Sequence, residues 1–277
     1  MTQDTAIRPL PRSIAITGAS SGLGAALALT YAAPGRTLAL GGRSTERLAR
    51  IAEQCRERGA VVTVHAGDVN DRPALAQWIA GIADSTPHGR LDLVIANAGI
   101  SGGTGGDRGA LESAEQTRRI FAVNLDGTIN TVLPAIAVMR RQAPAADGWR
   151  GQIAIVSSLV GFRGLPGAPA YTASKAAAKT WGEGLRGALA PEKIAVTVVC
   201  PGFVRTPMTD GNPFPMPFLM AAERAAAIVQ RRLARHPARI AFPWPMYVAA
   251  WLSGALPPGW LDPLLTRLPK KPARNDL

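Results

Sequence analysis

The sequence of 277 residues predicts an α/β fold: a single doubly wound domain in which helices flank a central parallel sheet of about seven strands. Two observations predict it. Short β-branched or apolar runs alternate with helix-length amphipathic segments, as in successive β-α-β units. The short runs are also apolar along their whole length, which suits a sheet covered by helices on both faces. No repeat or low-complexity linker divides the chain.

The expected elements follow one another along the chain. Strands are expected at Ser13–Thr17, Thr37–Leu40, Val61–His65, Leu91–Ala96, Gln152–Ser157, Ala195–Cys200 and Arg239–Phe242. Helices are expected at Leu23–Tyr31, Thr45–Arg58, Pro73–Ala83, Gln116–Arg141 and Ala173–Leu189. Residues 205–220 contain four prolines, which disrupt regular helices and central strands, so we expect a loop there. We therefore divide the chain into an N-terminal extension (1–12), a domain (13–242) that includes this loop, and a C-terminal extension (243–277).

The composition indicates a globular protein with a strong excess of positive charge. Apolar residues make up 47% and charged residues 18% of the chain, and the formal net charge is +12. This charge favours an anionic ligand or surface, but no basic motif with interleaved aromatics indicates nucleic-acid binding. Two cysteines give no disulfide framework, and three scattered histidines give no metal site. The N-terminus lacks an apolar signal segment, so we expect a cytoplasmic protein.

A glycine-rich turn follows the first expected strand and opens the first expected helix. It reads Thr17-Gly18-Ala19-Ser20-Ser21-Gly22-Leu23-Gly24. Glycines permit a tight turn and close approach of the backbone to a pyrophosphate, and the helix N-terminus offers free N–H groups to the anion. Such a turn also occurs with a purely structural role, but its place between a strand and a helix favours dinucleotide binding. The expected contacts are Gly18, Ser20, Ser21, Gly22, Leu23 and Gly24.

The ends of the next three strands carry further candidate cofactor contacts. An acidic residue at the end of the second strand would accept the ribose hydroxyl of NAD, whereas an arginine pairs with the 2′-phosphate of NADP. Arg43 stands there and therefore favours NADP(H) over NAD(H); the alternative is a solvated arginine that caps the next helix. Asp68 and Val69 close the third strand and are expected at the adenine. Asn97, Ala98 and Gly99 close the fourth, where a small residue lets the cofactor lie against the backbone.

Tyr171, Lys175 and Ser158 form a candidate proton-transfer group. If Tyr171 opens a helix, Lys175 lies one turn on, on the same face. An ammonium beside a phenol favours the phenolate, and the Ser158 hydroxyl would share the substrate oxygen with that phenol. We therefore expect the pKa of Tyr171 to fall from ~10 toward neutrality, helped by Lys175 and by a positive nicotinamide ring. The alternative for Tyr171 alone is a tyrosine packed at a helix start.

Together these residues resemble the short-chain dehydrogenase/reductase family over residues 13–206. The glycine-rich turn, Asn97-Ala98-Gly99, Ser158, Tyr171-x-x-x-Lys175 and Pro201-Gly202 match the family's motifs in the family's order. The resemblance implies a Rossmann-type fold, a nicotinamide cofactor and a small carbonyl or alcohol substrate.

The resemblance also implies a role for each matched residue. Tyr171 would be the general acid/base, Ser158 would orient the substrate oxygen, and Lys175 would lower the pKa of the tyrosine and hold the nicotinamide ribose. Asn124 matches the family's catalytic asparagine, which supports a proton-relay water, although asparagine alone is more typical of a cap or turn. The loop after the sixth strand would contact the nicotinamide through Pro201, Gly202, Val204 and Thr206.

The C-terminal extension departs from the family pattern. Residues 240–261 carry no formal charge and hold three of the tryptophans. Prolines leave only about ten residues of unbroken helix, Met246–Leu256, too few to cross a bilayer. Residues 240–277 therefore predict either an interfacial segment on anionic lipid or a helix packed on its own core or on a partner subunit. We expect a homo-oligomer, a dimer or a tetramer, although this segment differs from the one that packs the family's usual tetramer.

The sequence thus predicts an NADP(H)-dependent oxidoreductase that interconverts a carbonyl and an alcohol on a fairly apolar substrate. Methionine and phenylalanine side chains in 205–220 predict a lid over that substrate, or alternatively a cover for the sheet edge. Two other classes stay open: a cofactor-binding sensor with little turnover, and an interaction protein at the membrane periphery. The intact Ser158, Tyr171 and Lys175 argue against the sensor, because a silent site has no physical need for them.

Overall fold

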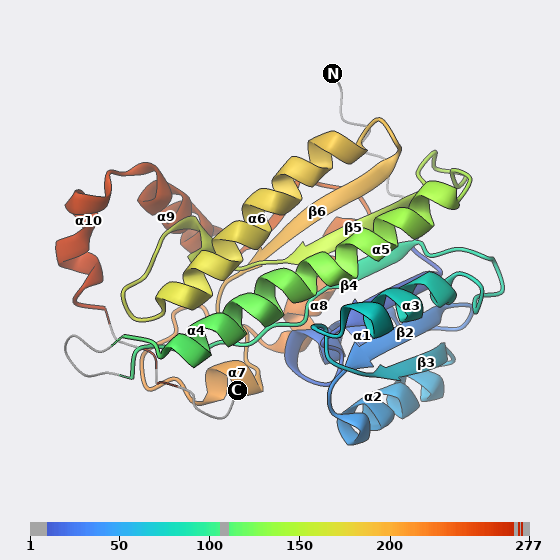
Figure 1. The fold of residues 1–277 in the computed structure, drawn as a ribbon, viewed down its shortest axis with the longest axis horizontal. Helices are drawn as coiled ribbons and strands as arrows, with labels where there is room; N and C mark the ends of the chain where they lie inside the picture. The colour runs from blue at the N-terminus through green and yellow to red at the C-terminus, as the bar shows by residue number, and fades with distance from the viewer. Residues whose placement is uncertain (1–9, 106–110, 269–270, 272, 274–277) are drawn as a thin grey trace.

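Seven parallel strands form one sheet at the centre of the computed structural model (Figure 1). The structure describes residues 10–105, 111–268, 271 and 273, so most of the expected extension 1–12 and much of the tail beyond residue 268 lie outside the described residues. The strand order is β3-β2-β1-β4-β5-β6-β7, which confirms the expected doubly wound α/β fold. The strands are β1 (Ser13–Thr17), β2 (Thr37–Gly42), β3 (Val61–Ala66), β4 (Leu93–Ala96), β5 (Gly151–Val156), β6 (Ile194–Pro201) and β7 (Arg239–Phe242).

All seven expected strands are present, with ends displaced by at most a few residues. The largest shift at the start of a strand is in β4, which begins at Leu93 rather than Leu91. The reason is a local competitor for the backbone, since the Leu91 N–H donates to the Gln142 side chain (2.6 Å) and not to a neighbouring strand.

Helices connect these strands. They are α1 (Gly22–Tyr31), α2 (Thr45–Glu57), α3 (Arg72–Ile82), α4 (Ala114–Phe121), α5 (Gly127–Arg141), α6 (Pro169–Leu189), α7 (Pro207–Asp210), α8 (Ala222–Leu233), α9 (Trp244–Ala255) and α10 (Pro258–Leu265), with a π-helical turn η1 (Ala122–Asp126) and a 3-10 turn η2 (Leu159–Phe162). Side-chain caps mark several of the starts, two of which follow β2 and β3. Ser44 accepts the Arg47 N–H at α2, and Asp71 accepts the Ala74 N–H at α3.

Alternate residues of the central strands face two separate cores. Ile14 and Ile16 of β1 are fully buried in a core shared with α1, α2 and α8. Ala15, between them, belongs to the core shared with α3, α5 and α6. Successive strand residues point to opposite faces. Helices on both faces therefore make every position of β1 a buried one, which explains its uninterrupted apolar run.

Two helices in the C-terminal part of the domain differ from the sequence expectations. The sequence analysis predicts no helix at α8, although apolar residues recur there with helical spacing and pack on α1. The expectation of a loop through 205–220 was wrong for the short helix α7. Pro207 stands in the first turn of α7, where its missing N–H costs no hydrogen bond.

The expected helix Gln116–Arg141 is a helical run from Ala114 to Arg141 that contains the π-turn η1. By length and hydropathy this run could cross a bilayer, but half of its most apolar stretch is buried inside the domain, as in the core helix of a globular protein. It packs beside α3 and α6. The run therefore carries no argument for a membrane span.

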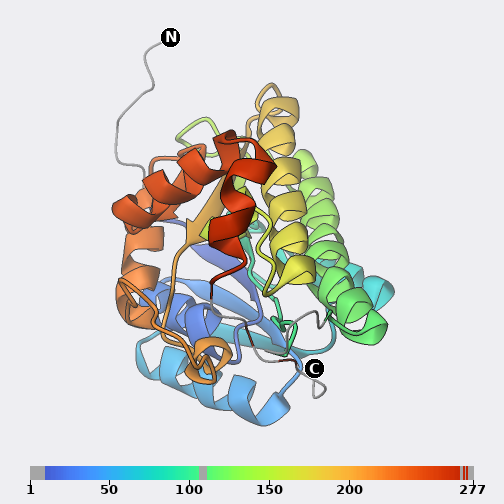
Figure 2. The same cartoon turned by 90° about the vertical axis from the view of Figure 1, so that its left-hand side faces the viewer.

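Helices α9 and α10 follow β7 and lie together at the end of the molecule toward which the strands point (Figures 1 and 2). The expected helix Met246–Leu256 begins two residues earlier, at Trp244, because Pro245 is tolerated in a first turn. Pro257 separates the two helices.

Candidate active site

A cavity of about 600 Å³ opens at the carboxyl ends of the strands. It brings together all of the residues expected to bind cofactor or substrate except Gly24 and Asn124. The expected residues that line it are Gly18, Ser20, Ser21, Gly22, Leu23, Arg43, Asp68, Val69, Asn97, Ala98, Gly99, Ser158, Tyr171, Lys175, Pro201, Gly202, Val204 and Thr206. Segments far apart in the chain meet here because the ends of parallel strands share one edge of the sheet.

Two glycine positions of the glycine-rich turn have no room for a side chain, because the neighbouring backbone lies too close. Gly18 has a φ of +68°, and a Cβ there would lie 2.8 Å from Ala98 Cα. Gly24 does not line the cavity, but a Cβ on it would lie 2.2 Å from the Gly18 carbonyl oxygen. The Ser21 side chain makes no capping hydrogen bond to α1. The first N–H groups of α1 therefore remain for an anion at the cavity wall.

Asn97 joins the end of β4 to this turn. Its Nδ2 donates to the carbonyl oxygens of Thr17 (3.0 Å) and Gly18 (3.2 Å), and its N–H donates to Thr17 Oγ1 (3.2 Å). These bonds fix the two strand ends that flank the cavity. Gly99, two residues on, leaves space beside Lys175, since a Cβ there would lie 3.3 Å from Lys175 Nζ.

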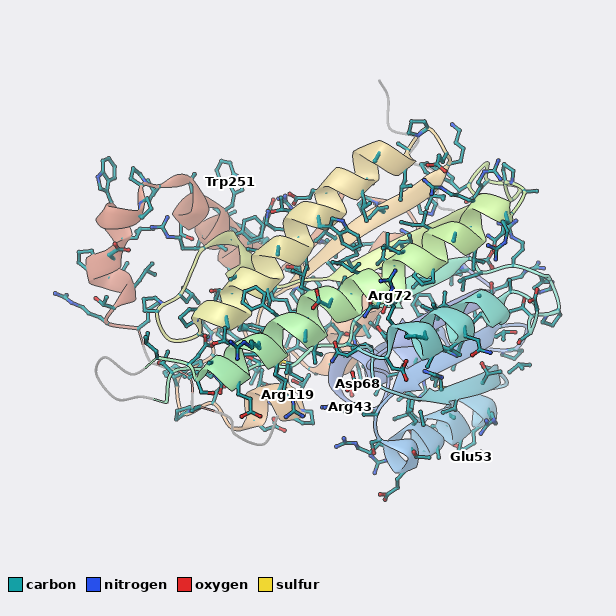
Figure 3. The ribbon with its side chains drawn as sticks, viewed as in Figure 1. Arg43, Glu53, Asp68, Arg72, Arg119 and Trp251 are labelled. Carbon is teal, nitrogen blue, oxygen red and sulfur yellow. The ribbon has the colours of Figure 1, made fainter. Side chains whose placement is uncertain are left out.

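Arg43 lies exposed at the end of β2 and lines the cavity (Figure 3). Ser44 rather than Arg43 supplies the side-chain cap of α2. Arg47, in the first turn of α2 and four residues after Arg43, also lines the cavity, and sequence reasoning missed it. Asp68 is labelled near Arg43 in Figure 3, and its Oδ1 accepts the Asn70 N–H (2.9 Å).

Tyr171 and Lys175 occupy the first two turns of α6. The helix start is held by Glu112, whose carboxylate accepts the Ala170 N–H (2.7 Å). Lys175 is buried, and its Nζ donates to the Val156 carbonyl oxygen (3.0 Å) at the end of β5. Ser157 in turn donates to the Lys175 carbonyl oxygen (2.7 Å). Helix α6 is thus tied directly to the end of β5.

Ser158 follows β5 and begins η2. Its Oγ accepts the Val160 N–H (3.3 Å) and donates to the Pro201 carbonyl oxygen (3.4 Å). It also forms a hydrogen bond with the Tyr171 phenol. The serine and the tyrosine therefore face the same point of the cavity, where one substrate oxygen would contact both.

The protein's own groups raise the pKa of Tyr171 rather than lower it; the fall expected from sequence also counts a positive nicotinamide ring and stays a prediction. Burial raises the pKa of Tyr171 to about 12, and the hydrogen bond with Ser158 offsets this only in part. Burial also lowers the pKa of Lys175 to about 8, against a small opposing effect of Cys200. Burial disfavours the charged phenolate, and this effect is larger than the lowering by Ser158.

Asn124 lies behind the cavity wall, in η1. It is fully buried, and its Oδ1 accepts the Ile100 N–H (2.8 Å). Its Nδ2 donates to the Ile100 carbonyl oxygen (3.0 Å) and to Ser174 Oγ (3.0 Å). Asn124 therefore joins the segment after β4 to α6 and does not itself face the cavity.

The substrate half of the cavity comes largely from the C-terminal part of the chain. Met208, Phe214, Pro215 and Pro217 line it, so the loop 205–220 covers the site rather than only the sheet edge. The base of this loop is closed where Val204 pairs with Met220. Phe214 packs edge-on against Phe203, with ring centroids 6.3 Å apart.

Three further lining residues come from beyond β7, and sequence reasoning missed them. They are Met246, Leu268 and Lys271. Lys271 Nζ donates to Ser101 Oγ (2.8 Å) and lies 5.7 Å from the centre of the Tyr171 ring. No local pattern indicates this contact, because Lys271 and Ser101 are 170 residues apart.

Comparisons with known proteins agree with this geometry. The family model for short chain dehydrogenases matches residues 12–213. An uncharacterised oxidoreductase of Myxococcus xanthus (strain DK1622) is 36% identical over 260 residues, which cover 93% of this chain and 97% of that protein. A 3-ketoacyl-ACP reductase structure from Sinorhizobium meliloti 1021 shares 27% identity at a TM-score of 0.73, covering 86% of this chain and 99% of the other. An NAD-bound short chain dehydrogenase structure from Mycobacterium paratuberculosis is similar in fold, with 24% identity, a TM-score of 0.70, and coverage of 83% and 95%.

Proposed function

This chain belongs to the short-chain dehydrogenase/reductase family of oxidoreductases, and we propose that it interconverts a carbonyl and an alcohol on a fairly apolar substrate with NADP(H). The observation that carries the proposal is the position of Tyr171 and Ser158. They line one cavity together with the glycines of the cofactor turn and the apolar side chains of the loop 205–220.

The cofactor half fits a dinucleotide. The close packing at Gly18 and Gly24 leaves backbone, not side chains, along the first part of the cavity. The start of α1 supplies N–H groups for the pyrophosphate. Arg43 and Arg47 supply two guanidinium groups at the end of β2, a pairing that suits the 2′-phosphate of NADP.

The proton transfer of the proposed reaction is carried out by side chains of the protein. When bound, the nicotinamide exchanges a hydride with the substrate carbon. Tyr171 donates its phenolic proton to the carbonyl oxygen in reduction, or removes the hydroxyl proton in oxidation, while Ser158 holds that oxygen in place. The raised pKa keeps the tyrosine protonated at neutral pH, the form that donates a proton in the reduction direction.

Lys175 and Asn124 act behind this pair. Lys175 holds a positive charge close to the site at neutral pH, because its lowered pKa of about 8 is still above 7. Asn124 keeps α6 and the segment after β4 in register through Ser174 and Ile100. We assign both residues to positioning and charge rather than to direct proton transfer from substrate.

The test is a carbonyl substrate screen that follows NADPH and NADH oxidation with the wild type and Arg43→Ser. We expect turnover of apolar ketones or aldehydes with NADPH preferred. Arg43→Ser should raise the KM for NADPH roughly 10–100-fold, because a charged hydrogen-bonded pair contributes about 1.5–3 kcal/mol, and should leave the KM for NADH unchanged.

Arg50→Ser is the matched control. It removes the same charge from an exposed position of α2 that does not line the cavity, so it should change neither KM. Equal effects of the two variants, or a wild type that prefers NADH, would overturn the cofactor assignment. Cofactor binding without turnover on any carbonyl would overturn the reaction class.

A further inference from the structure

Two short helices at the C-terminal end of the fold expose a cluster of large apolar side chains. On α9, Trp244, Val248, Trp251 and Leu252 are 74%, 42%, 53% and 50% exposed. On α10, Trp260 and Leu264 are 74% and 60% exposed. Single exposed apolar residues are ordinary, but six large ones on two consecutive short helices indicate an interaction surface. We term these six residues the α9–α10 face.

Helix α9 has an inner and an outer side. Met246, Tyr247 and Ala250 pack against a small core of Leu159, Val198 and Cys200. Gly254 comes so close to η2 that a Cβ would lie 2.6 Å from the Phe162 carbonyl oxygen. The domain's own core therefore occupies this side of the helix.

The outer side repeats with the period of a helix. Trp244, Val248, Trp251 and Leu252 stand at relative positions 0, 4, 7 and 8, so they share one stripe. Figure 3 labels Trp251 at the end of the molecule that α9 and α10 form, and in Figure 2 both helices face the viewer. The stripe is thus an outer surface and not an unfilled part of the core.

We propose that the α9–α10 face docks on the surface of an anionic phospholipid membrane. Three tryptophans are the residue type that favours the headgroup region, where an apolar ring and a polar N–H are both satisfied. Residues 243–266 contain one charged residue, Asp262, whereas the whole chain carries +12. The exposed Arg267 lies two residues beyond the end of α10. An apolar face on a strongly cationic protein matches an anionic interface.

The same charge argues against a second copy of this chain as the occupant. At this face the net charge of +12 favours anionic lipid over a second, equally cationic copy, while the homo-oligomer expected from sequence would form through other faces. The helices lie along the surface rather than across it, since α9 has 12 residues and α10 has 8, well short of the roughly 20 that a span needs. Leu268, just beyond α10, lines the cavity, so docking would place the substrate half beside the bilayer.

The test is cosedimentation of the full chain, loaded with NADPH, with two kinds of vesicle. One is phosphatidylcholine alone and the other an equimolar mixture with phosphatidylglycerol. The variant is Trp251→Ser/Trp260→Ser/Leu264→Ser. The control is Val61→Ser/Leu111→Ser/Leu133→Ser, which removes exposed apolar side chains elsewhere. Sedimentation velocity without lipid reports the oligomeric state of each protein, and far-UV circular dichroism reports folding.

We expect binding to the mixed vesicles at least ~10-fold tighter than to phosphatidylcholine, weakened by high salt. The α9–α10 variant should lose at least ~10-fold of this binding, while the control retains it and the oligomeric states stay equal. Quenching of tryptophan emission by brominated lipid should vanish in a Trp244→Phe/Trp251→Phe/Trp260→Phe variant that still binds. Unchanged vesicle binding by the serine variant overturns the proposal. So does a folded variant whose loss is a dissociation into smaller oligomers, which would assign the face to a second copy.

Discussion

The two halves of the cavity are built in different ways. The cofactor half consists of residues that directly follow β1, β2, β3 and β4, and the Asn97 hydrogen bonds to Thr17 and Gly18 lock it to the sheet. The substrate half consists of the loop 205–220 and residues beyond β7. These segments line the cavity with side chains such as Phe214, Met246 and Lys271.

This difference separates what the fold requires from what it leaves free. A backbone-lined surface at the strand ends has no room for substitution, because a new Cβ would collide with main-chain atoms. A surface of loop side chains can change without disturbing the sheet. Small substitutions in the cofactor half are therefore expected to lower stability and cofactor binding. Substitutions in the substrate half are expected to change mainly the affinity for substrate.

The largest effect is expected at the junction of the two halves. Tyr171→Phe removes the proton donor but keeps the ring, so kcat/KM should fall roughly 10²–10⁴-fold while the Kd for NADPH stays unchanged. Steady-state kinetics and cofactor fluorescence titration measure the two quantities. A phenylalanine variant with wild-type turnover would show that another group supplies the proton.

The pH dependence of the free energy of unfolding tests how strongly Lys175 is buried in the same site. In the folded chain its pKa is about 8, below the ordinary value of 10.5. Between these pH values the unfolded chain binds a proton that the folded chain does not, so the free energy of unfolding rises with pH. We expect this rise to total about 3 kcal/mol relative to Lys175→Met, measured by denaturant unfolding at pH 7, 9 and 11. Parallel pH profiles for the two proteins would contradict the assignment.

Gly24→Ala tests the close packing of the cofactor half. The new Cβ would meet the Gly18 carbonyl oxygen at 2.2 Å, so the turn must move. We expect a loss of about 1–3 kcal/mol in the free energy of unfolding and a weaker Kd for NADPH. The control is Gly184→Ala in α6, where no atom outside the adjoining helix backbone lies within 4 Å of the new Cβ. It should stabilise the protein by about 0.5–1 kcal/mol, and a loss there equal to that of Gly24→Ala would refute the packing explanation.

The smallest effect is expected in the substrate half. Phe214→Ala removes part of the apolar lining, so the KM for an apolar carbonyl should rise about fivefold, equivalent to about 1 kcal/mol, with no change in the KM for NADPH. Phe218→Ala alters the same loop at a side chain that is 59% exposed and does not line the cavity. It should leave both values unchanged. If the two variants behave alike, the loop does not contact the substrate through Phe214.

The sequence by itself determined the seven-stranded sheet, the cofactor turn and the Tyr171–Lys175 pair. Each depends on residues close together in the chain, or on the rule that ends of neighbouring parallel strands meet at one edge. Apolar runs indicate strands, glycines between a strand and a helix indicate a phosphate turn, and a four-residue spacing places two side chains on one helix face.

Only the tertiary structure decided the direction of the Tyr171 pKa, the place of Asn124 behind the cavity wall, and the reach of Lys271 to Ser101. It also decided which side of α9 the core covers and which side stays open to solvent. Burial and contacts across 170 residues depend on everything that packs around a side chain. No local pattern holds that information.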